Sequence, residues 1–203
     1  MQTTLAKWIS IILMPLLVPL YSLLIIYTLP LYGVLIIPQQ YRLIILGMVF
    51  VSTFLFPVVM LLIMMRRGLV NSLHLDRRQE RIIPLMITGF FFFLAYNMVR
   101  NMHLDEVFLK IFLGSFLSVM LALIISLFWK ISMHMIGMGG LVGGLVGIAL
   151  STGIDLTGWI ALSFLAAGLT GTARLLLQAH SPAQIYSGFA AGFFVLLILF
   201  VWL

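Results

Sequence analysis

Residues 107–129 read VFLKIFLGSFLSVMLALIISLFW, a stretch of 23 residues in which Lys110 is the only charged side chain. About 20 consecutive apolar residues are enough for a helix to cross the hydrocarbon core of a bilayer. A β-barrel strand would instead alternate polar and apolar residues over about ten positions. This stretch therefore predicts a membrane-spanning helix.

The whole chain has the same character. Of its 203 residues 64% are hydrophobic and 8% are charged, whereas soluble domains carry about 25% charged residues. In lipid, only helices or closed barrels satisfy every backbone polar group, and the continuous apolar runs favour helices. The net charge is +6, but the basic residues lie between apolar runs. They fit topology, lipid headgroups or an anionic substrate, and nucleic acid is not expected as a partner.

We expect an all-α polytopic transmembrane bundle of about six to seven spans, forming a single membrane domain over residues 1–203. Seven apolar segments are delimited by charges or turn residues: Trp8–Tyr27, Arg42–Met65, Ile82–Val99, Val107–Trp129, Ser132–Ser151, Thr157–Leu177 and Ala183–Leu203. Residues 28–40 are apolar but contain two prolines and a glycine. This piece is interfacial, re-entrant or part of a kinked first helix, since Pro15 and Pro19 interrupt the helical ladder.

The longest polar segment is the Arg-rich loop of residues 66–81, RRGLVNSLHLDRRQER. If the linkers alternate between the two sides, eight basic residues lie on the side of this loop and three on the other. The positive-inside rule would make the richer side cytoplasmic. No cysteine is present, which excludes thiolate metal sites and is compatible with a bacterial inner membrane, the expected location.

Glycine is concentrated in the fifth segment, at positions 137, 139, 140, 143, 144 and 147, and the last segment adds Gly188 and Gly192. Small residues spaced four apart allow two membrane helices to approach backbone to backbone. We interpret both sets as packing surfaces.

Two short stretches break the apolar rule, 130–134 (KISMH) and 174–184 (RLLLQAHSPAQ). Each lies between two segments, and both fall on the side of the Arg-rich loop. Polar and ionisable groups at the edge of a membrane bundle are costly and therefore candidates for function. Two histidines and two cations, with serine and glutamine beside them, suit an anion better than a metal ion, so no metal or other cofactor is expected.

The second stretch resembles the third signature of the type 2 phosphatidic acid phosphatase superfamily, which is Ser-Arg, five residues, His, three residues, Asp. Arg174 and His180 match it, while Ala173 replaces Ser and Gln184 replaces Asp. The first stretch resembles the second signature, Pro-Ser-Gly-His, through Ser132 and His134. The resemblance covers residues 107–203, the expected phosphatase-like core. Residues 1–106 would hold the remaining helices and the Arg-rich loop.

The resemblance implies a metal-free lipid phosphatase that forms a phosphohistidine. His180 would attack phosphorus, Gln184 would orient His180, and His134 would protonate the leaving oxygen. Arg174, Ser132 and Lys130 would bind the phosphate. The first signature, Lys, six residues, Arg-Pro, is not found, and Arg77, Arg78 or Arg81 could supply its charge.

The expected substrate is a lipid or polyprenyl phosphate or diphosphate, at the edge of the membrane. Two alternatives stay open: an inactive relative that binds lipid phosphate headgroups, and an unrelated transporter. The sequence does not fix the oligomeric state or the membrane face of the site. Bacterial members of the family often work at the outer face, whereas the arginine distribution favours the cytoplasmic face.

Overall fold

The computed structural model describes residues 2–70 and 79–202. Within these ranges the chain is helical and contains no β-strand. Seven helices in the described part are long and apolar enough to cross a membrane. The predicted all-α multi-pass bundle is therefore confirmed. The spans are Thr3–Ile26, Gln39–Arg66, Gln79–Asn101, Glu106–Ser126, Met133–Thr152, Thr157–Leu176 and Pro182–Trp202.

Prolines divide the first two spans. The first consists of α1 (Gln2–Ile12), a 3-10 turn (η1, Pro15–Leu17) and α2 (Val18–Ile26). The second consists of α4 (Gln39–Phe50), a π-helical turn (η2, Val51–Leu55) and α5 (Phe56–Arg66). Pro15 and Pro57 lie at these irregularities, because proline lacks the N–H that would continue the ladder and its ring clashes with the preceding turn.

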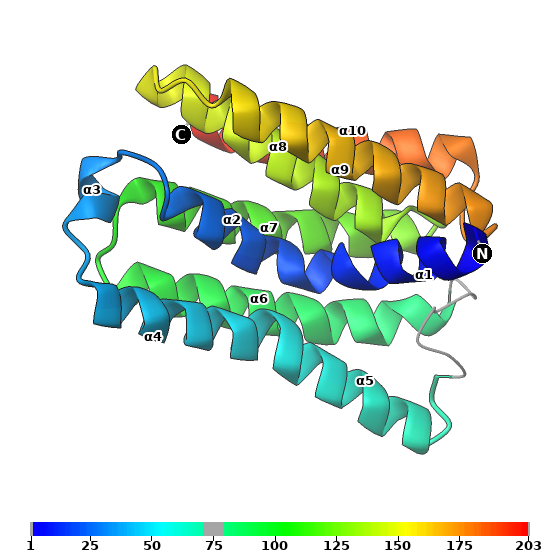
Figure 1. Ribbon diagram of the computed structural model, residues 1–203. Helices are drawn as coiled ribbons and strands as arrows, with labels where there is room; N and C mark the ends of the chain where they lie inside the picture. The colour runs from blue at the N-terminus through cyan, green and yellow to red at the C-terminus, as the bar shows by residue number, and fades with distance from the viewer. Residues whose placement is uncertain (1, 71–78, 203) are drawn as a thin grey trace.

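The remaining spans are regular. The 3-10 turn η3 (Gln79–Arg81) leads into α6 (Ile82–Asn101), followed by α7 (Glu106–Ser126), α8 (Met133–Thr152), α9 (Thr157–Leu176) and α10 (Pro182–Trp202). The helices run side by side along the bundle (Figure 1). The N-terminus lies at the same end as the connections from α7 to α8 and from α9 to α10, which we call the histidine end. The C-terminus lies at the opposite end.

Residues 27–38 form a connection at the end opposite the histidine end, with the single short helix α3 (Tyr32–Leu35) (Figure 1). Arg42 fastens this connection, since its Nε and Nη2 atoms donate to the carbonyls of Ile37 and Val34 at 2.9 and 2.8 Å. Of the alternatives for this piece, the structure favours a short connection outside the spans, next to a kinked first helix.

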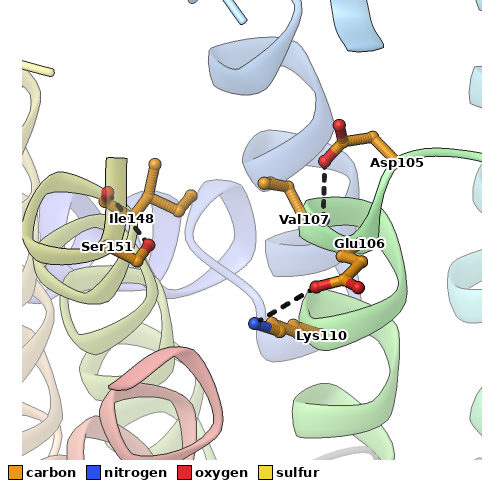
Figure 2. Close-up of polar contacts among 6 residues, drawn as sticks. All are labelled: Asp105, Glu106, Val107, Lys110, Ile148 and Ser151. Carbon is orange, nitrogen blue, oxygen red and sulfur yellow. Dashed lines mark hydrogen bonds and ion pairs between the residues drawn. The ribbon is translucent and has the colours of Figure 1, made fainter. Parts of the chain in front are cut away.

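Figure 2 shows the start of α7, at the same end as α3. The Asp105 carboxylate accepts the N–H of Val107 at 3.0 Å and caps the helix, and Glu106 pairs with Lys110 at 3.6 Å. Acidic groups in the first turn stabilise a helix through its dipole. These charged residues lie at the end of α7 opposite the histidine end, and their role is structural.

Helices α8 and α10 pack backbone to backbone. A Cβ atom added at Gly139, Gly143 or Gly192 would collide with a main-chain carbonyl of the other helix, and one at Gly188 would lie 2.8 Å from the carbonyl oxygen of Ser132. The interpretation of these glycines as packing residues is confirmed. The contact fixes the start of α8 against the start of α10, and this brings the two polar stretches together.

Candidate functional site

A cavity of about 460 Å³ opens at the histidine end and extends along the interior of the bundle. Charged or titratable side chains line only this end of it: Lys7, Arg81, His134, Arg174 and His180. Among the described residues, none that lines the cavity is acidic. The site is therefore strongly basic at its polar end, and beyond it the lining is uncharged and mostly apolar, with the hydroxyl residues Ser22, Thr88, Ser115 and Ser118 among it.

His180 lies between α9 and α10, and its ring is held by Gln184. Its Nδ1 atom is 3.0 Å from Oε1 of Gln184, and the same Oε1 accepts the backbone N–H of Ser181 at 3.2 Å. Because this atom already accepts one N–H, it is the amide oxygen, so Nδ1 of His180 must donate to it. The proton is thus fixed on Nδ1, and Nε2 keeps its lone pair.

His180 is 8% exposed. Burial lowers the pKa of its imidazole to about 4, the hydrogen bond to Gln184 acts in the opposite direction, and the nearby cations Arg81, Arg174 and Lys130 lower the pKa further. The ring is therefore neutral at physiological pH. A neutral imidazole with a free Nε2 is the form that can act as a nucleophile.

Two buried guanidinium groups accompany His180. Arg81 and Arg174 are each 5% exposed, and placing a charge in such surroundings is costly unless it has a partner. Arg81 donates to the carbonyl of Ile131 at 2.9 Å, and Nη1 of Arg174 donates to Oγ of Ser10 at 3.4 Å. Cations buried at the edge of a membrane bundle indicate a functional site.

Arg81 is the candidate from the Arg-rich loop that the structure brings to the cavity. Arg81 therefore adds a buried cation to the polar end of the cavity. Arg77 and Arg78 lie outside the described residues. Lys130 is half-buried and close enough to affect His180 electrostatically, but it does not line the cavity.

His134 is in the first turn of α8 and contacts the first helix. Its Nε2 atom lies 3.0 Å from the carbonyl oxygen of Ser10. A carbonyl only accepts, so Nε2 carries a proton. Helix α1 ends at Ile12, before Pro15, and a helix end leaves carbonyls such as that of Ser10 open to other donors.

Ser132 occupies a different place from the one expected of a phosphate ligand. It is fully buried at the contact of α8 with α10, and its N–H donates to the carbonyl of Gln184 at 3.3 Å. Its hydroxyl has no hydrogen-bond partner among the described residues and does not line the cavity. Ser132 joins the two polar stretches through its backbone.

Ser10 and Lys7 line the polar end of the cavity, and sequence reasoning did not select either. Both belong to α1, outside the part of the chain that resembles the phosphatases. The sequence offered one signal, Pro15, which predicts that the helix carrying Lys7 and Ser10 ends nearby. A proline predicts where a helix ends, but it does not predict which other helices pack beside that end.

The described residues contain no group of three or more His, Cys, Asp or Glu side chains that could hold a metal ion. The cavity offers guanidinium, ammonium and imidazole groups instead. Such groups donate hydrogen bonds of the kind that pair with oxyanions.

No family model matches the chain, and no curated protein or solved structure matches it either.

Proposed function

We propose that this protein is an integral-membrane phosphatase that removes phosphate from a lipid or polyprenyl phosphate or diphosphate through a phosphohistidine. The observation that carries the proposal is a buried His180, fixed by Gln184 at 3.0 Å and placed with Arg81 and Arg174 at the polar end of one cavity. Beyond this end the cavity lining is uncharged and mostly apolar, which suits the lipid part of such a substrate.

In the first step, Nε2 of His180 donates its lone pair to phosphorus. An N–P bond forms and the P–O bond to the lipid, or to the inner phosphate of a diphosphate, breaks. The bonding pair leaves with that oxygen, which takes a proton from His134. Because Nε2 of His134 donates to Ser10, the transferred proton would come from Nδ1. Water then attacks phosphorus and returns a proton to Nδ1 of His134, the N–P bond breaks with its electron pair going back to Nε2 of His180, and orthophosphate and neutral His180 are released.

The cations act mainly in the transition state. Charge accumulates on the equatorial phosphoryl oxygens during transfer, and preorganised donors aimed at these oxygens stabilise it. Arg81 and Arg174 are held by Ile131 and Ser10, so little reorganisation is needed when the substrate binds. Lys130 and Lys7 add positive potential that attracts the anionic headgroup.

The replacement of the family's Asp by Gln184 favours a second candidate, a headgroup receptor without turnover. A neutral amide orients the imidazole but does not stabilise its cationic form. In a serine protease triad, the corresponding change from Asp to an amide costs about 10⁴ in rate. Binding of a lipid phosphate without hydrolysis would therefore fit the same site.

The test is release of orthophosphate by detergent-purified protein with excess chelator, from a polyprenyl diphosphate and from phosphatidic acid. We expect turnover of at least one of these lipids without metal, and its loss in His180→Ala and His134→Ala. His103→Ala is the matched control, because His103 is on the linker between α6 and α7, away from the cavity. Absence of release from every lipid phosphate would contradict the phosphatase and leave the receptor to be tested by headgroup binding.

A further inference from the structure

The apolar part of the cavity is long. On α8 its lining includes His134, at the histidine end, and reaches Ile148. These residues are 14 positions apart, which at 1.5 Å per residue is about 21 Å. The hydrocarbon core of a bilayer is about 30 Å thick. The cavity thus continues from the phosphate site across most of the membrane.

The far part of the cavity, which we call the tail channel, is bounded by Val18, Ser22, Ile26, Ile111, Gly144 and Ile148. Ile26 and Ile148 are each 1% exposed and Ile111 is 5% exposed. These side chains are shielded from the surrounding lipid by the bundle. The tail channel is therefore an internal apolar space, not a groove on the lipid-facing surface.

The tail channel is also narrow. The side chains that bound it, those of Val18, Ser22, Ile26, Ile111 and Ile148, are each at most 8% exposed, so its walls lie close together. Apolar carbon atoms pack about 4 Å apart, so two hydrocarbon chains side by side need about twice the width of one. The tail channel has no room for two chains side by side.

Helix α8 makes this space by presenting glycines on a second face. Gly139 and Gly143 contact the backbone of α10, whereas Gly137, Gly140 and Gly144 line the cavity, the last two beside the side chain of Leu196 of α10. A Cβ atom at Gly144 would meet nothing closer than Leu196, at 3.9 Å. The helix-packing role therefore does not explain the absence of a side chain at Gly144.

The cavity also reaches the outside of the bundle beside α1. Ile11 lines the cavity and is 53% exposed. A tail could enter there from the surrounding lipid, next to the polar end, without passing through water.

We infer that the tail channel binds the single hydrocarbon tail of a lipid phosphate and that Gly144 sets how long a tail it accepts. The headgroup part of this inference rests on the proposed function; the tail part rests on the shape of the cavity. Prenyl phosphates and single-chain glycerophosphates share the required chemistry. Phosphatidic acid, with two chains, would fit poorly.

Binding of non-hydrolysable phosphonates tests the inference independently of turnover. The probes are isopentenyl, geranyl, farnesyl and geranylgeranyl phosphonate, a single-chain glycerol phosphonate and its two-chain counterpart, measured on protein in lipid nanodiscs. We expect Kd to fall at least about tenfold from the shortest to the longest prenyl probe as more apolar surface is buried. Comparison of the prenyl phosphonates with the single-chain glycerol phosphonate shows which lipid class is preferred.

Gly144→Leu should fill the channel and raise the Kd of the longest probe at least about tenfold. The Kd of the isopentenyl probe should stay the same. Gly168→Leu is the matched control, because Gly168 is an exposed mid-helix glycine of α9 with no atom within 4 Å of an added Cβ. Ile148→Ala, which lengthens the channel, should favour the longest probe. This variant keeps the test decisive if Gly144→Leu does not fold.

Equal weakening of all probes by Gly144→Leu, no dependence on tail length, or tighter binding of the two-chain probe would overturn the tail channel. These outcomes differ from failure of the proposed function. Length-dependent binding without phosphate release would retain the channel and reject the phosphatase. Phosphate release that is insensitive to Gly144→Leu would retain the phosphatase and reject the tail channel.

Discussion

The Nε2 atom of His134 lies 3.0 Å from the carbonyl oxygen of Ser10, 124 residues earlier in the chain. The hydroxyl of the same Ser10 accepts from Arg174 at 3.4 Å. One residue of α1 thus contacts a residue from each polar stretch. The first helix, which lies outside the two polar stretches and far from them in the sequence, completes the candidate site.

Ser10→Ala should weaken the site without dismantling it. The substitution removes the hydroxyl partner of Arg174 but keeps the carbonyl that holds His134. Loss of one hydrogen bond of about 1 kcal/mol corresponds to about a fivefold drop in kcat/KM for phosphate release. Ser163→Ala is the control, since Ser163 is buried in α9 but does not line the cavity. Equal effects of the two substitutions would contradict a specific role for Ser10.

The contact between α8 and α10 predicts a large difference between two glycine substitutions. Gly139→Ala places a methyl group against the carbonyl of Phe189, and such overpacking costs about 1–3 kcal/mol. Gly168→Ala has no atom within 4 Å of its new methyl group and should be neutral or stabilising, because alanine favours helix. Thermal unfolding in detergent measures both. A Gly139→Ala protein as stable as the native one would show that the helices can separate without cost.

The spans could be predicted from the sequence because lipid imposes a simple rule. A run of apolar residues long enough to cross the core must be helical, and this rule places most span ends within a few residues. The first span was the least accurate, since it starts at Thr3 instead of Trp8. The helix begins before the apolar run, and its first residues include the polar Thr3, Thr4 and Lys7. A search for apolar residues therefore placed the start too late.

The site was predictable only where residue types share a local pattern. His134, Arg174, His180 and Gln184 lie in two short stretches, and the structure brings them to one end of the bundle. The part played by Ser10 depends on which helix packs beside α8 and α9, which periodicity does not reveal. Ser132 matched the pattern, yet its hydroxyl is covered by α10 because Gly188 allows the close approach.

The pKa of His180 gives the proposed phosphatase activity a specific pH dependence. The nucleophile must be neutral, and the depressed pKa keeps it neutral down to about 4. Titration of His180 should therefore leave the rate of phosphate release unchanged above a pH of about 4. Release should be lost as the pH falls through this value. An unperturbed histidine would instead lose activity near pH 6.5. The pH profile of kcat/KM, with a folding check at each pH, distinguishes the two.

Gln184→Glu tests whether the amide limits turnover. Glutamate has the same length as glutamine, so its carboxylate reaches Nδ1 of His180 at the observed distance of 3.0 Å. The added negative charge favours the imidazolium and raises the pKa of His180. It also stabilises the positive charge that develops on the ring when the N–P bond forms.

We therefore expect Gln184→Glu to raise kcat at least about tenfold and to shift the acid limb of the pH profile upward. Gln184→Asp, whose side chain is one methylene shorter, should gain less because its carboxylate ends farther from the ring. Gln178→Glu is the charge-matched control, at an exposed position of the same connection. A shifted pH profile with unchanged kcat would mean that phosphoryl transfer is not rate-limiting. Loss of activity in Gln184→Glu with the pH profile unmoved would contradict the assignment of Gln184 as the partner of the nucleophile.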